Sequence, residues 1–158
     1  IQLAPMVEEI FTDLTPLAEK SGITLELAGD GVMTGSDALI YRMIFNLTEN
    51  AIKYNRPDGS VQVCITQEPE KLLILVSDTG RGIPEEYQQS IFQPFFRVDK
   101  SRSRTFGGAG LGLALVWEIA ALHGGSVRVA ESSDSGTTIA AELPRSGNHA
   151  ADPKNEML

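Results

Sequence analysis

The stretch from Lys71 to Asp78, KLLILVSD, constrains the fold most, because five consecutive apolar residues lie between its polar ends. A nearly continuous apolar run bounded by turn-forming residues is typical of a strand in the middle of a sheet. Residues 61–67 (VQVCITQ) form a second strand-like run, and Glu68-Pro69-Glu70 joins the two as a turn. We therefore expect a hairpin in which residues 71–78 are a central strand of a sheet.

Helical and strand-like patterns alternate along the rest of the chain. Residues 5–20 have apolar side chains three and four positions apart, which predicts a helix with Pro5 in its first turn and a bend or break at Pro16. The other expected elements are a strand at 23–28, a turn and short edge strand at 29–36, a helix to 54 capped by Ser36 or Asp37, a helical segment at 84–92, a helix at 111–123, and a hairpin of 126–131 and 137–143. This order predicts an α+β two-layer sandwich.

The composition sets limits on the class of protein. The chain has 158 residues, which corresponds to one domain, and no apolar run approaches the roughly 20 residues that span a bilayer. The single cysteine excludes an internal disulfide. A net charge of −8 argues against general nucleic-acid binding. The start without Met and without a signal-peptide pattern indicates a fragment of a longer protein.

Polar side chains follow one face of the predicted helix that ends at Tyr54. Asn46, Asn50 and Lys53 are spaced by four and three residues, so they share one stripe opposite the apolar face. Amide oxygens and an ammonium group suit a phosphate bridged by Mg²⁺, which takes hard oxygen ligands and keeps several waters. A solvated helix face would have the same pattern, so this stripe alone leaves both interpretations open.

Two glycine-containing segments follow the central strand. Asp78 begins the sequence DTGRGIP, in which a carboxylate can accept from an exocyclic amino group and the glycines let the backbone approach a flat ligand. An ordinary turn is the alternative. Gly108, Gly110 and Gly112 then open the helix at 111–123, where free N–H groups and the helix dipole favour an anion. A flexible hinge is the alternative there, but the four cations just upstream favour a polyphosphate; they are Arg97, Lys100, Arg102 and Arg104.

Together these blocks resemble the ATP-binding catalytic domain of bacterial sensor histidine kinases, from about residue 3 to Pro144. This domain shares a superfamily with the DNA gyrase B subunit, MutL proteins and heat-shock chaperones. The segments NLTENAIKY, DTGRGIP, IFQPFFRVD, GGAGLGLAL and SGTT resemble its N, G1, F, G2 and third glycine boxes. The resemblance implies a Bergerat-type fold, a mixed sheet with about three helices on one face, an ATP lid at 93–110 and a domain over 1–144. The tail at 145–158 has no periodicity, and we expect it to be disordered.

The resemblance also implies roles for individual residues. It makes ATP and Mg²⁺ the ligands, with Asn50 and Asn46 on the metal and Asn46 and Arg97 in the catalytic machinery. Lys53 and Arg97 would contact phosphate, Tyr54 would pack on adenine, and Asp78 would accept from the adenine amino group. Thr137, rather than Thr138, would lie near the base. The remaining implied ligand-binding residues are Gly80, Gly82 and Ile83 along the base, and Gly108, Gly110, Leu111, Gly112 and Leu113 over the phosphates.

The identity of residue 46 distinguishes phosphoryl transfer from ATP hydrolysis within this superfamily. The ATP-hydrolysing members of the superfamily have Glu at its place, and Asn lacks the basicity to activate water. The resemblance therefore implies transfer of the γ-phosphoryl group to a histidine. Neither His123, before Gly124-Gly125 at a helix end, nor His149, in the tail, resembles a phosphoacceptor.

The expected partner is thus a helical dimerisation and phosphoacceptor domain of the same parent, with a response regulator downstream. We expect a monomeric, cytoplasmic piece of a membrane sensor that binds no nucleic acid. The cationic lid would also present Phe92, Phe95, Phe96 and Phe106, which either dock the acceptor helices or anchor the loop to the core. Three alternatives to a histidine kinase remain open: an ATP-driven conformational module, a serine kinase of the anti-sigma-factor type, and a degenerate domain that only binds a partner.

Overall fold

The computed structural model describes residues 1–94, 96 and 112–146. Its centre is one five-stranded sheet with the strand order β1-β2-β3-β5-β4. The strands are β1 (Thr24–Gly29), β2 (Ser60–Gln67), β3 (Lys71–Asp78), β4 (Ser126–Ser133) and β5 (Gly136–Pro144). β1 runs parallel to β2 and the other neighbours are antiparallel, so the sheet is mixed. β3 is the middle strand, which confirms the expectation from its apolar run.

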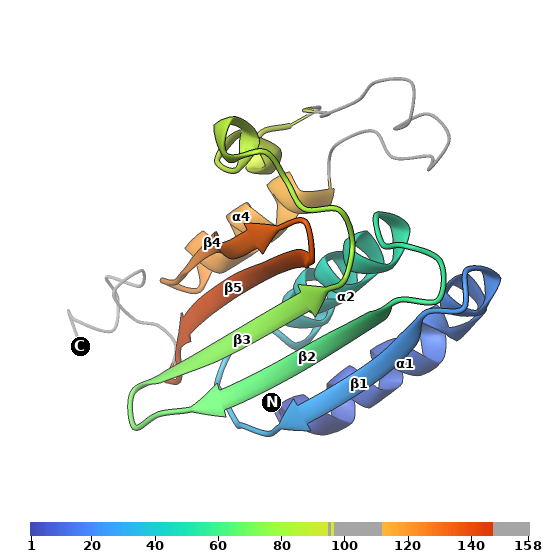
Figure 1. Cartoon of the computed structure of the whole chain (residues 1–158). Coiled ribbons are helices and arrows are strands. Elements are labelled where there is room, and N and C mark those ends of the chain that lie inside the picture. Colours follow the sequence, from blue (N-terminus) through green and yellow to red (C-terminus); the bar gives the residue numbers. More distant parts are fainter. Residues whose placement is uncertain (95, 97–111, 147–158) are drawn as a thin grey trace, which may run out of the picture.

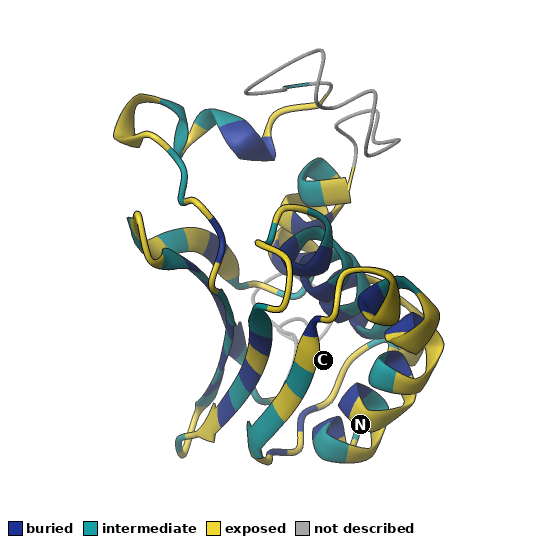
Figure 2. Ribbon diagram, turned by 45° about the vertical axis from the view of Figure 1, so that its right-hand side comes forward, coloured by how far each residue is buried: buried dark blue, intermediate teal, exposed yellow. Residues whose placement is uncertain are grey.

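Three helices cover one face of this sheet (Figure 1): α1 (Leu3–Lys20), α2 (Asp37–Lys53) and α4 (Gly112–Leu122). Alternate residues of β3, Leu72, Ile74 and Val76, are buried beneath them. The dark blue positions in Figure 2 line the space between helices and sheet, as the alternation of a half-covered strand requires. The predicted two-layer α+β sandwich is therefore confirmed.

Two local predictions need correction. α1 continues through Pro16 to Lys20 as one helix, because its buried face, which includes Ile10, Leu14 and Ala18, holds it against the core. The segment predicted to be helical at 84–92 contains two short 3-10 helices, η1 (Glu85–Tyr87) and η2 (Ser90–Phe92). Only Ile91 and Phe92 of these are buried, so the segment has too small an apolar face to support a full helix.

The helix that carries the asparagines begins at a well-formed cap. The Ser36 hydroxyl accepts from the Leu39 amide at 3.2 Å, which selects Ser36 over Asp37 as the cap. His123 binds the same turn, since its Nε2 accepts from the Ser36 amide at 3.2 Å and its Nδ1 lies 2.9 Å from the Ile119 carbonyl oxygen. His123 thus joins the end of α4 to the start of α2, which is a structural role.

The end of the sheet opposite Asp78 is closed by Arg145. Its guanidinium donates to the carbonyl oxygens of Val32, Glu68 and Pro69, and its own amide donates to Glu70. The folded unit therefore includes at least one residue beyond the predicted boundary at Pro144. Among the described residues, none of the helices has both the length and the apolar character needed to cross a membrane.

Candidate active site

The asparagine stripe lies on α2 beside the first residue of α4. The Asn46 side chain donates from Nδ2 to the Gly112 carbonyl oxygen at 3.3 Å, which leaves its Oδ1 available. Asn50, one turn further along, is half-buried and its side chain makes no hydrogen bond to a described residue. The Lys53 ammonium lies 3.8 Å from the Glu49 carboxylate and forms an i,i+4 ion pair that the sequence analysis did not anticipate.

Asp78 ends the central strand and is the most constrained carboxylate in the site. Its Oδ1 accepts from the Gly80 amide at 2.9 Å and from the Thr137 amide at 3.2 Å. Burial raises the pKa of this carboxyl group, and the two amide hydrogen bonds oppose that rise only in part. No described residue donates to Oδ2, so one oxygen is fixed while the other can accept from a ligand.

The glycines around Asp78 allow backbone segments to touch. A Cβ on Gly80 would lie 2.5 Å from the carbonyl oxygen of Tyr54, and a Cβ on Gly136 would lie 1.9 Å from that of Asp78. Gly82 has a φ of 86°, which favours glycine, and packs against the backbone of Ser133. The segment after β3 is therefore held between the end of α2 and the tip of the β4–β5 hairpin.

Thr137 lies beside Asp78 and Thr138 does not. The side chain of Thr137 is buried, and its hydroxyl is 2.8 Å from the Ser132 hydroxyl, which also accepts from the Ile83 amide at 2.8 Å. Thr138 instead bonds Ser77 at 2.8 Å. Because strand neighbours point to opposite faces, only Thr137 shares the helix-covered side with the site. Ile83 itself is half-buried against the core.

The start of α4 completes the described part of the site. Among the described residues, a Cβ on Gly112 would meet only Asn46 Nδ2, at an ordinary contact distance of 3.9 Å. Leu113, the next residue, packs partly against the core. Four predicted ligand-binding residues lie outside the described residues: Arg97, Gly108, Gly110 and Leu111.

Asn50 and Asn46 offer the oxygen ligands that a magnesium ion would need. The Asn50 side chain has no described partner, and Asn46 uses only its amide nitrogen toward the described residues, so neither amide oxygen is bonded within the described part of the chain. In the described part of the chain, no group of three His, Cys, Asp or Glu residues could hold a metal. The available donors therefore fit Mg²⁺ that keeps most of its waters, and they do not fit a transition-metal centre.

The structure adds residues that the sequence analysis missed. The Thr79 hydroxyl donates to Asn55 Oδ1 at 2.8 Å and accepts from the Ser60 amide at 2.9 Å, which fixes the loop after α2 beside Gly80. Thr79 lies between Asp78 and Gly80 in the DTG motif, so the sequence could have indicated that it belongs to the site. Ser132 had no such signal, because nothing in the sequence placed it beside Ile83 and Thr137.

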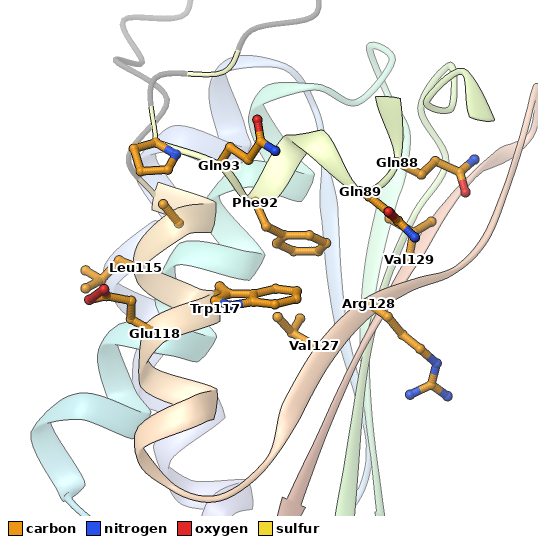
Figure 3. A pocket seen from close by; sticks show the side chains of 12 residues that line it. Gln88, Gln89, Phe92, Gln93, Leu115, Trp117, Glu118, Val127, Arg128 and Val129 are labelled. Carbon is orange, nitrogen blue, oxygen red and sulfur yellow. The ribbon is translucent and has the colours of Figure 1, made fainter. Parts of the chain in front are cut away.

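A separate groove of about 1150 Å³ lies between η2, α4 and β4 (Figure 3). Its floor contains Phe92 and Trp117, whose ring centroids are 5.5 Å apart. Phe92 is 7% exposed, which favours its interpretation as an anchor of the loop. Phe96 packs on Tyr87 at 5.6 Å, whereas Phe95 and Phe106 lie outside the described residues. None of the predicted nucleotide-binding residues that the structure describes lines this groove.

Residues 35–147 match the model of the histidine kinase-, DNA gyrase B- and HSP90-like ATPase family, and the chain belongs to that family. The sensor histidine kinase RppB of Synechocystis is 34% identical over 145 residues, which are 90% of this chain and 32% of RppB.

Two solved structures extend the comparison. The mycobacterial sensor histidine kinase MprB has a TM-score of 0.77 at 26% identity, covering 94% of this chain and 97% of that one. Full-length ShkA in complex with AMPPNP has a TM-score of 0.79 at 25% identity, covering 97% of this chain and 32% of that one. The chain spans about a third or less of the curated relatives it matches. Its fold and relatives identify it as an ATP-binding domain of the sensor histidine kinase type.

Proposed function

We propose that this domain binds ATP with Mg²⁺ and donates the γ-phosphoryl group to a histidine that lies outside the chain. The observation that carries the proposal is the Asp78 carboxylate at the end of the central strand, with Oδ1 held by two amides and Oδ2 bonded to no described residue. An open, oriented carboxylate oxygen suits the exocyclic amino group of adenine. We name Asp78, Gly80, Gly82, Ile83, Tyr54 and Thr137 the base side of the site.

The phosphate side consists of Asn46, Asn50, Lys53, Gly112 and Leu113, with Arg97, Gly108, Gly110 and Leu111 as further members by resemblance. Asn50 and Asn46 would hold the metal through their amide oxygens, and the metal would neutralise charge on the phosphates. The bond between the γ-phosphorus and the bridging oxygen breaks, a bond from phosphorus to an imidazole nitrogen forms, and ADP leaves. The domain contributes position and charge, and the nucleophile comes from another domain.

Asn46 favours transfer over hydrolysis, because an amide cannot take a proton from an attacking water. The acceptor in this proposal is a dimerisation and phosphoacceptor helical domain of the same parent, and a response regulator receives the phosphoryl group next. The chain would then work on the cytoplasmic side of a sensor, where ATP is present. The structural neighbour ShkA was crystallised in complex with AMPPNP, which agrees with nucleotide binding by this type of domain.

Calorimetry of the chain with ATP and ADP, with and without Mg²⁺, tests the first half of the proposal. We expect Mg²⁺-dependent ATP binding and no continuous release of inorganic phosphate. In the full-length parent, we expect an acid-labile phosphohistidine that disappears in the Asp78→Asn variant. Multiple-turnover phosphate release by the chain would favour an ATP-driven module, and no binding at millimolar nucleotide would favour a partner-binding domain.

A further inference from the structure

A β-bulge in the edge strand β4 decides which side chain faces the base side. Val129 pairs with Ile139, whereas Ser132 pairs with Thr137, so β4 contains one extra residue between these two pairs. Without the register shift, Glu131 would stand opposite Thr137. Bulges re-aim side chains in this way and occur beside functional sites. Here the bulge replaces a carboxylate with a hydroxyl next to the residue whose amide binds Asp78.

The re-aimed hydroxyl joins two segments that both reach Asp78. Ser132 Oγ accepts from the Ile83 amide at 2.8 Å and lies 2.8 Å from Thr137 Oγ1. The Thr137 amide donates to Asp78 Oδ1 at 3.2 Å, and the chain from Asp78 to Ile83 closes the ring. Ser132 is thus the link in this ring that comes from β4, whereas the others come from β5 or from the end of β3 and the segment after it.

We infer that Ser132 is a positioning residue for the base side and sets how strongly the site prefers a purine with an exocyclic amino group. The inference rests on the proposed nucleotide binding. Oδ2 of Asp78 can select an amino group only while Oδ1 and the segment from Gly80 to Ile83 are fixed. Removing the Ser132 hydroxyl breaks the hydrogen bond from the Ile83 amide and the contact with the Thr137 hydroxyl. The orientation of Asp78 Oδ2 then becomes less defined.

The preference for the amino group can be measured with two ligands that differ only in that group: ADP and purine riboside 5′-diphosphate. A hydrogen bond to a charged group contributes roughly 1.5–3 kcal/mol, so the wild-type chain should prefer ADP by about ten- to a hundredfold. In Ser132→Ala we expect the preference to fall below about threefold, mainly through weaker binding of ADP. Ser132→Thr keeps a hydroxyl and should keep most of the preference.

Ser126→Ala is the matched control, because Ser126 is an exposed serine at the other end of the same strand. It should leave both affinities unchanged. Thr137→Val breaks the same hydroxyl pair from the other strand and should reproduce the loss of preference, so it decides the question if Ser132→Ala folds poorly.

A Ser132→Ala variant that weakens both ligands equally, or neither, would show that Ser132 is only structural and would overturn the inference. A wild-type chain that binds both diphosphates with equal affinity would overturn it as well, while nucleotide binding itself would stand. A wild-type chain that binds neither diphosphate would overturn the proposed function and this inference together.

Discussion

On the base side, Asp78 accepts two amide hydrogen bonds and Thr137, Ser132 and Ile83 are linked to one another. On the phosphate side, the Asn50 side chain bonds no described residue and the Lys53 ammonium is paired with Glu49. The base side is therefore built before any ligand arrives, so little ordering cost remains for binding the base. The described groups of the phosphate side would gain most of their partners from the ligand.

Two glycine substitutions test whether the base side is more closely packed than the phosphate side, and the one on the base side should give the largest change in stability. Gly136 has a φ of 138°, and a Cβ there would lie 1.9 Å from the Asp78 carbonyl oxygen. Gly136→Ala should lower the free energy of unfolding by about 3 kcal/mol. Gly112→Ala, where a Cβ would meet no described atom closer than 3.9 Å, should change it by less than about 0.5 kcal/mol. Urea denaturation measures both, and equal losses would contradict a tight base side.

Asp78→Asn should give the next largest effect, on affinity. Replacing the accepting oxygen with an amide nitrogen removes a charge-assisted bond of roughly 1.5–3 kcal/mol, so ATP and ADP should each bind at least about tenfold more weakly. Asp134→Asn is the matched control, since it removes the same charge from an exposed residue of the neighbouring hairpin turn. If calorimetry finds equal affinities for Asp78→Asn and the control, Asp78 does not contact the base.

The raised pKa of Asp78 gives a smaller, pH-dependent effect with opposite signs for folding and binding. Burial raises the folded-state pKa above the usual 3.8, so the folded chain holds the proton more tightly than the unfolded chain does. Stability from this group therefore increases as pH falls from the raised value toward 3.8, while ADP affinity decreases, because the ionised form is the acceptor.

Paired measurements on wild type and Asp78→Asn isolate this contribution. The variant should exceed wild type in stability near neutral pH, and the excess should shrink as the pH is lowered. Denaturation and ADP calorimetry at several pH values provide both curves. A stability difference that stays constant across the range would show that Asp78 does not titrate with a shifted pKa.

The Glu49–Lys53 pair provides the smallest test, on the phosphate side. Exposed helical pairs of this kind contribute about 0.3–0.5 kcal/mol, and both side chains here are partly exposed. Glu49→Gln should free Lys53 and strengthen ATP binding about twofold, with little change for adenosine. Equal changes for ATP and adenosine would show that Lys53 does not act on phosphate.

Periodicity predicted the elements because it reports which face is buried. The apolar run before Asp78 placed β3 at the centre, and the spacing of Asn46 and Asn50 placed both on one face of α2. Pro16 does not break α1, because the apolar face of this helix outweighs one lost backbone hydrogen bond. The position of β3 and the shared face of the two asparagines follow from residue spacing within one segment, so they could be predicted from the sequence.

The missed features depend on how the strands pair in the sheet. The bulge that turns Ser132 toward Thr137 exists only in the pairing of β4 with β5. The contact of Gly136 with Asp78 likewise requires β5 to lie beside β3. The DTGRGIP segment supplied Asp78 as a candidate and the resemblance supplied Thr137, but the hydrogen bond between them comes from the sheet register, which no local pattern encodes.

A crystal structure of the chain with ADP and Mg²⁺ tests the central claim most directly, because it locates the base. We predict that the adenine amino nitrogen lies about 3 Å from Asp78 Oδ2, with Oδ1 still bonded to Gly80 and Thr137. A base found elsewhere, for example in the groove of Phe92 and Trp117, would contradict the assignment of Asp78 as the base anchor.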